Sequence, residues 1–97
     1  MIVKWLEEAY ADLDQIFDYI LERNPEAALK VSGAIRHQVG MLADHPQIGR
    51  TGRVRGTREL VITDLPYIAA YYIKGQEVRI LAVLHTSRKW PQSFNLE

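Results

Sequence analysis

Four arginines lie close together in the middle of the chain: Arg50, Arg53, Arg55 and Arg58 fall within nine residues, with no acidic residue among them. A guanidinium is a planar cation with several N–H donors, and it binds phosphate and carboxylate groups particularly well. Four such cations repel one another unless a partner supplies negative charge. We therefore expect this segment to contact an RNA or DNA backbone or an acidic protein segment. The alternative is a solvated loop whose arginines pair with acidic residues of the first predicted helix.

A second group of candidate residues follows the last apolar run of the sequence, where His85 precedes Arg88 and Lys89. An imidazole titrates near neutral pH, so His85 is a candidate general acid or base. The alternative is a structural histidine whose ring hydrogen-bonds the loop that follows it. Arg88 and Lys89 extend the set of cations that an anionic partner can contact.

Aromatic residues accompany both basic segments. Tyr67 and Tyr71 share one face of a predicted strand, because side chains alternate along a strand, whereas Tyr72 lies on the other face. Aromatic rings beside arginines can stack on nucleobases, which makes Tyr67, Tyr71 and, in the tail, Trp90 candidates for stacking. The alternative is that the rings pack in the core with their hydroxyls at its rim.

Other kinds of chemistry find little support in the sequence. The chain has no cysteine, which excludes disulfides, thiolate zinc sites and a cysteine nucleophile. No spacing of histidine or acidic residues brings three ligands together, and the glycines form no phosphate-binding fingerprint, so we expect neither a metal nor a cofactor. Ser87 has no evident catalytic partners, and we expect Glu59 to pair with the adjacent Arg58.

The length and composition indicate what kind of protein carries these residues. The chain has 97 residues, of which 47% are hydrophobic and 25% charged, so we expect a single globular domain over residues 1–97. No apolar run reaches the ~20 residues that span a bilayer. Glu7 and Glu8 fall where a signal peptide would continue its apolar region, so we expect a cytoplasmic protein without membrane contact.

The N-terminal half predicts a short strand and two helices. Ile2–Trp5 is compatible with a strand, and over residues 7–23 the apolar side chains recur with the three-and-four spacing of a helix. Asn24 and Pro25 then form a typical helix start, because asparagine can cap the free amides and proline is tolerated in the first turn. The second helix runs to about Asp44, and two consecutive amphipathic helices form a helical hairpin.

The C-terminal half predicts three strands. Runs of β-branched and aromatic residues cover 59–63, 67–73 and 78–85, and short turns separate them. The run Val78–Leu84 is nearly all apolar, so we expect it to be a central strand with helices on at least one face. The order β-α-α-β-β-β predicts an α+β fold, with the helical hairpin packed on one face of a small antiparallel sheet.

The zero net charge of the chain is the sum of two opposed halves. Residues 1–44 hold eight acidic and four basic residues, whereas residues 45–97 hold eight basic and four acidic residues. The neutral total argues against an anionic partner. The uneven distribution of charge, however, leaves a basic half that can bind one. The acidic half coincides with the predicted helices, and the basic half centres on residues 50–58, which we call the arginine-rich segment.

Several short motifs follow one another in an order typical of one protein family. They cover nearly the whole chain: Ala11–Ile20, Asn24-Pro25-x-Ala27-Ala28, Leu42–Pro46 followed by Gly49-Arg50, Gly56–Leu60, Pro66-Tyr67 followed by Tyr71, and Val78–His85. In these motifs the sequence resembles the RelE/ParE toxin superfamily. The resemblance implies the toxin of a type II toxin–antitoxin module, which stabilises plasmids and arrests growth when the antitoxin is absent.

The resemblance also implies a fold and a partner. The family fold is two helices packed on a small antiparallel sheet, in agreement with the elements predicted above. The co-expressed antitoxin typically wraps an extended or helical segment around the toxin and represses the operon through a DNA-binding domain. We therefore expect a heteromeric complex with a cognate antitoxin.

The superfamily divides into two mechanisms, of which the first is chemical. RelE-type members cut messenger RNA on the ribosome, and many carry an arginine directly after the first aromatic residue of the third strand. The matching position here is Ile68, and Leu60–Ile62 lacks the lysines found in some of those enzymes. A cutting site would have to be assembled from other groups: His85, Arg58 and Arg88 as catalytic residues, with Arg50 and Arg53.

ParE-type members instead bind DNA gyrase and trap its complex with cleaved DNA, without chemistry of their own. The pattern of residues 11–20, the join His45-Pro46-x-x-Gly49 and the strand end Val83-Leu84-His85 are closer to that branch. We therefore expect a ParE-like gyrase poison, with a RelE-like mRNA interferase as the alternative. A plain binding module, or a decayed toxin that only titrates an antitoxin, is the third hypothesis.

Overall fold

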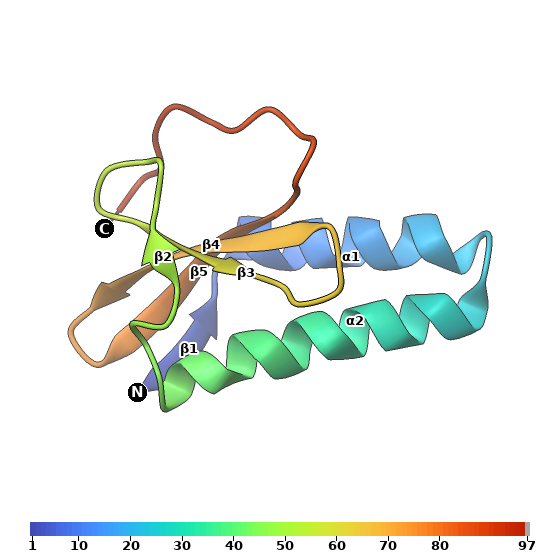
Figure 1. The fold of residues 1–97 in the computed structure, drawn as a ribbon, viewed down its shortest axis with the longest axis horizontal. Helices are drawn as coiled ribbons and strands as arrows, with labels where there is room; N and C mark the ends of the chain where they lie inside the picture. The colour runs from blue at the N-terminus through green and yellow to red at the C-terminus, as the bar shows by residue number, and fades with distance from the viewer. Residues whose placement is uncertain (97) are drawn as a thin grey trace.

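A helical hairpin packs on a five-stranded sheet in the computed structural model, which describes residues 1–96 (Figure 1). The elements follow in the order β1 (Ile2–Trp5), α1 (Glu7–Leu21), α2 (Pro25–Gly40), a 3-10 turn (Met41–Ala43), β2 (Arg50–Thr51), β3 (Arg58–Val61), β4 (Tyr67–Lys74) and β5 (Glu77–His85). The predicted α+β class, with helices first and then a run of strands, is confirmed. Within the described residues, neither helix is long and apolar enough to cross a membrane.

The sheet has the strand order β1-β5-β4-β3-β2. The pairs β3–β4 and β4–β5 are antiparallel, as predicted, and β2–β3 is antiparallel as well. The sheet is not wholly antiparallel, because β1 pairs parallel with β5: the helical hairpin between them forms a crossover connection. The strand β2 was not predicted, since two residues are too few to show an alternating pattern. It adds one short strand beside β3 and brings the arginine-rich segment onto the sheet.

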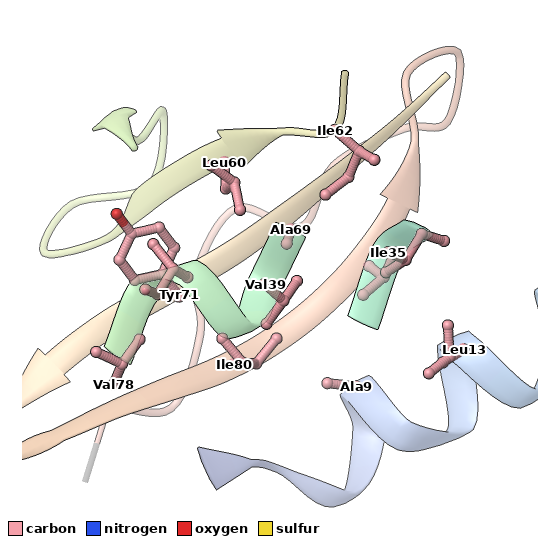
Figure 2. Packing of buried hydrophobic residues seen from close by; sticks show 12 residues of the cluster. Ala9, Leu13, Ile35, Val39, Leu60, Ile62, Ala69, Tyr71, Val78 and Ile80 are labelled. Carbon is pink, nitrogen blue, oxygen red and sulfur yellow. The ribbon is translucent and has the colours of Figure 1, made fainter. Parts of the chain in front are cut away.

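The two helices begin and pack as their sequences indicate. The side chain of Asn24 accepts a hydrogen bond from the backbone N–H of Ala27 at 3.2 Å, and Pro25 occupies the first turn of α2. The buried residues of α1 and α2 face the sheet and meet its inner side chains in the main core, which Figure 2 shows from close by. That core contains Ala9, Leu13, Ile35 and Val39 from the helices, Leu60, Ala69, Tyr71, Val78 and Ile80 from the sheet, and Ile62 directly after β3.

The opposite face of the sheet carries a smaller apolar cluster. Ala70, Tyr72 and Leu81 are buried there, and the C-terminal segment covers them with Trp90 and Phe94. This segment, residues 86–96, forms neither helix nor strand and is red in Figure 1. The helices therefore cover one face of the sheet, and the tail covers part of the other.

The strand β5 is apolar almost throughout because both of its faces are covered, and a bulge changes the order in which its side chains face the two sides. Ala70 pairs with Ala82, but the next residue of β4, Tyr71, pairs with Ile80, so Leu81 has no partner across the ladder. The alternation of faces restarts at this point. Ile80 and Val83 therefore both belong to the main core although three positions separate them. Since β1 and β4 flank it, β5 is an interior strand, while the middle position belongs to β4.

Candidate functional site

The arginine-rich segment is organised around one buried carboxylate, that of Glu59. Its side chain is 2% exposed and accepts hydrogen bonds from Arg50 Nη2 at 3.0 Å and from Arg53 Nε at 3.1 Å. The backbone N–H of Arg53 also donates to Glu59, at 2.7 Å. The pairing of β2 with β3 sets Arg50 directly opposite Glu59. The expectation that Glu59 pairs with Arg58 is wrong, because neighbouring side chains of a strand point to opposite faces.

The Glu59 carboxylate is held in its charged form. Burial alone would raise its pKa, but the hydrogen bonds from Arg53 and Arg50 outweigh burial and lower the pKa below its usual range. The two arginine side chains keep 55% and 46% of their surface exposed. They are therefore fixed in place by Glu59 and still accessible to an anionic partner.

The other two arginines of the segment have different surroundings. Arg58 is half-buried, and its Nη1 donates to the carbonyl oxygens of Gly49 at 2.8 Å and Gln47 at 3.3 Å. Arg55 is exposed, and its side chain has no hydrogen bond or ion pair to any of residues 1–96. The described ion pairs of the segment all go to Glu59, and none goes to α1. Arg58 thus ties the preceding loop to β3, whereas Arg55 is free to bind.

Tyr71 is a core residue, which corrects its candidacy for base stacking. The side chain is fully buried, and its hydroxyl donates to the Pro46 carbonyl at 2.9 Å while accepting from the Gly49 N–H at 2.9 Å. Burial raises the pKa of Tyr71, so the hydroxyl keeps its proton. A Cβ on Gly49 would lie 2.5 Å from this hydroxyl, which explains the glycine. The ring cannot reach a nucleobase, because the main core surrounds it.

Trp90 lies in the tail, where one face of its ring carries a cation. The guanidinium of Arg53 stacks over the ring at 3.9 Å from its centroid. The indole N–H is buried and has no acceptor among residues 1–96. The ring therefore links the tail to the arginine-rich segment through a cation–π contact, and its predicted stacking on a base remains a prediction.

His85, at the end of β5, contacts the turn that follows it. Its Nδ1 lies 3.1 Å from the backbone N–H of Ser87 and 2.8 Å from Ser87 Oγ, and its ring meets Tyr67 edge-on at 5.5 Å. These contacts agree with the structural role that we gave as the alternative for this histidine. Its Nε2 has no hydrogen bond to any of residues 1–96.

The three groups expected to form a cutting site do not all come together. His85 pairs with Tyr67 and Arg58 pairs with Tyr71, so four residues of β4 separate the two positions. At about 3.3 Å per residue, this separation is about 13 Å along the strand. Arg88, in contrast, shares a pocket with His85. Lys89 is exposed beside it.

The pocket beside His85 was not predicted. It has a volume of about 370 Å³ and lies between α1 and the C-terminal end of β5. One wall is Asp12, whose carboxylate accepts a hydrogen bond from the backbone N–H of Val83 at 2.9 Å. The contact joins residues 71 positions apart, and sequence spacing cannot reveal it. The available signal was an acid directly before Leu13 on the apolar side of the first helix.

No group of three histidine or acidic side chains within residues 1–96 could hold a metal ion. At two sites the described residues bring cations together with one carboxylate: the arginine-rich segment and the pocket beside His85. Glu59 anchors Arg50 and Arg53 at the first place, and Asp12 shares the pocket with Arg88 at the second. The arginines at each place can bind an anionic group.

Comparison with known proteins gives a consistent result. The family model "ParE toxin of type II toxin-antitoxin system, parDE" matches residues 3–90. The protein Y4kP of Sinorhizobium fredii is 43% identical over 90 residues, which cover 93% of each chain. Toxin RelE2 of Caulobacter vibrioides is 35% identical over 86 residues, covering 89% of this chain and 96% of the relative.

A solved structure extends the likeness to three dimensions. A chain of the chromosomal ParDE toxin–antitoxin system from P. aeruginosa superposes with a TM-score of 0.80 at 36% sequence identity. The match covers 88% of this chain and 95% of that chain. Sequence and fold therefore agree over nearly the same residues.

Proposed function

This chain belongs to the ParE toxin family of type II toxin–antitoxin systems, and from that premise we propose that it poisons DNA gyrase by binding alone. As a member of the family, it is the toxin of such a module and has an antitoxin as its partner. On our proposal the whole chain, residues 1–97, acts as one domain in the cytoplasm. Free toxin binds gyrase and holds its complex with cleaved DNA, and bound antitoxin prevents this.

The observation that supports binding over cutting is the separation of Arg58 from His85. An mRNA interferase needs cations that stabilise the developing phosphate charge and an acid or base that moves the 2′-hydroxyl proton. Arg58 lies about 13 Å along β4 from His85, and its guanidinium is engaged with the carbonyls of Gly49 and Gln47. The position where many RelE-type enzymes carry an arginine holds Ile68, which is buried.

The proposed gyrase contact is the arginine-rich segment. Glu59 fixes Arg50 and Arg53 with about half of each side chain exposed, and Arg55 projects without an internal partner in the described part of the chain. Cations held in place before binding lose less conformational entropy when they meet an anionic surface. This preorganisation suits a poison that acts by binding.

A ribosome-dependent mRNA interferase is the second candidate, and one observation favours it. His85, Ser87 and Arg88 line the same pocket, where a proton-transferring group and a cation lie together. A site of this composition could act on a phosphodiester if the ribosome supplied the remaining groups.

Expression of the toxin without its antitoxin tests the proposal. We expect growth arrest with induction of the DNA-damage response and filamentation, and primer extension should find cellular messages intact. Codon-linked message cuts that disappear in His85→Ala, while antitoxin binding survives, would overturn the proposal in favour of the interferase. Unimpeded growth would instead indicate a plain binding module or a decayed toxin.

A further inference from the structure

The pocket beside His85 exists because β1 is shorter than β5. The two strands pair from Ile2 to Trp5, and the N–H of Leu6 makes a last bond to the Ile80 carbonyl at 3.0 Å. Beyond Ile80 this edge of β5 has no neighbouring strand, and α1 passes beside it instead. Asp12 takes the free N–H of Val83, and the space between helix and strand remains open as a pocket of about 370 Å³. Pockets of this size hold one small ligand.

Two arginines supply positive charge at this pocket. Arg88 lines it with an exposed side chain whose guanidinium makes no hydrogen bond or ion pair to residues 1–96. Arg23 does not line the pocket, but its guanidinium stacks over the ring of the lining residue Tyr19, 4.0 Å from the ring centroid. A guanidinium beside a pocket is a ready contact for a phosphate group.

The same pocket has aromatic walls. Tyr19 on α1 is 62% exposed, and Tyr67 at the start of β4 lines the pocket with it. Both tyrosines line the same pocket, and burial, together with the Tyr19 hydroxyl, raises the pKa of Tyr67. The Tyr67 ring also meets the His85 ring edge-on. Rings in such a setting can stack on a base.

The helix side of the pocket adds hydrogen-bonding groups for the edge of a base. One carboxylate oxygen of Asp12 accepts a hydrogen bond from the Val83 N–H, and the other oxygen has no hydrogen bond within residues 1–96. Gln15, one helical turn further, contributes an amide that can both donate and accept. A carboxylate and an amide together match the donors and acceptors that nucleobases present.

We propose that this pocket binds one unpaired nucleotide, with its base between Tyr19 and Tyr67 and its phosphate on Arg88. Nucleotide binding at this pocket does not depend on gyrase being the target, because the nucleotide can belong to a DNA strand or an RNA strand. The pocket is separate from the arginine-rich segment and would fix a single-stranded end that the segment does not reach.

The combination of charges favours a nucleotide over a protein side chain. An acidic side chain that reaches Arg88 would approach the Asp12 carboxylate, and a basic side chain that reaches Asp12 would approach Arg88. A nucleotide separates its anionic phosphate from the neutral donor groups of its base. It can therefore satisfy both sides of the pocket at once, whereas inorganic phosphate can use the cation alone.

A nuclear magnetic resonance titration of the full-length chain with 5′-deoxyadenosine monophosphate tests the inference without gyrase. We expect saturable shifts at Tyr19, Tyr67, His85 and Arg88. Adenosine and inorganic phosphate should each bind at least about tenfold more weakly, since each lacks one half of the recognition. Short single strands of DNA and of RNA should shift the same resonances, and the tighter of the two identifies the source of the nucleotide.

Matched variants make the test specific. Tyr19→Ala and Arg88→Ala should each weaken nucleotide binding at least about fivefold. The controls Tyr10→Ala and Arg36→Ala remove an exposed tyrosine and an exposed arginine outside the pocket and should leave it unchanged.

Three results would overturn the inference. These are shifts absent at saturating nucleotide, equal binding of inorganic phosphate, or equal losses in the control variants. An antitoxin peptide that shifts the pocket resonances when the nucleotide does not would assign the pocket to a protein partner instead. Because the titration contains no gyrase, its failure leaves the proposed gyrase poisoning standing.

Discussion

Glu59 determines how the arginine-rich segment is presented. It is nearly inaccessible to solvent, and it binds two arginine side chains and one backbone N–H. The cluster of arginines is evident from the sequence, but this anchor is not. The reason is that the pairing depends on the register between β2 and β3, and two-residue strands leave no pattern from which a register can be read.

Replacing Glu59 with glutamine should destabilise the fold and loosen the segment. We expect the free energy of unfolding to fall by about 1–3 kcal/mol at neutral pH, because charge-assisted hydrogen bonds become neutral ones. The folded pKa of Glu59 lies below its ordinary value of 4.5. Its contribution is therefore present above that value and is lost as the pH falls through the folded pKa.

Urea unfolding of both proteins at pH 7 and in acid measures this difference. The gap between wild type and Glu59→Gln should narrow in acid. Glu77→Gln is the control. Glu77 pairs with Arg79 near the surface, so this change should lower the free energy of unfolding by less than Glu59→Gln does. A gap that stays constant with pH would contradict the assigned role of Glu59.

Tyr71→Phe should also destabilise the protein, because the change leaves the N–H of Gly49 and the carbonyl of Pro46 without their partner. We expect a loss of about 1–3 kcal/mol in the free energy of unfolding. Tyr67→Phe is the matched control: its hydroxyl has no hydrogen bond within residues 1–96, so the change should stay within about 0.5 kcal/mol. Equal effects of the two variants would refute the hydroxyl's role.

At the scale of elements, the helices were easier to predict than the strands. Helical periodicity and the Asn24-Pro25 start are local signals, and both appear in the structure as expected. In β5 the bulge at Leu81 reverses the facing pattern, and an almost wholly apolar run conceals that reversal. The pocket beside His85 escaped prediction for a similar reason, because its residues come from α1, β4 and β5.

The start of α2 offers a test of the local signal. Asn24→Ala removes the side chain that accepts from Ala27 N–H, and the helix loses its cap. The expected cost is about 1 kcal/mol in the free energy of unfolding, measured by thermal or urea denaturation. Lys30→Ala, at an exposed position within the same helix, should change stability by less than about 0.5 kcal/mol. A similar loss in both variants would mean that the cap contributes nothing specific.

At the scale of the molecule, the opposed charges belong to different layers. The acidic half is the helical hairpin, and the basic half lies on the later strands and their loops. The sequence resemblance to the RelE/ParE superfamily is confirmed over nearly the whole chain. Family membership identifies the antitoxin as a partner, and the charge layers offer it surfaces of both signs.

The antitoxin should stabilise the toxin by mass action, because it binds the folded chain. At a free concentration one hundred times its dissociation constant, the expected gain is about 2.7 kcal/mol. Thermal denaturation of the toxin with and without saturating antitoxin measures this gain as a higher melting temperature. An unchanged melting temperature would count against a partner that recognises the folded state.

Gyrase poisoning by binding alone can be tested directly with purified components. The decisive measurement is the amount of gyrase-cleaved DNA recovered when purified toxin is titrated into a supercoiling reaction. We predict that supercoiling falls, that cleaved DNA accumulates with toxin, and that antitoxin reverses both changes. Unaltered supercoiling and cleavage at saturating toxin, in a preparation that still arrests growth when expressed, would contradict the account.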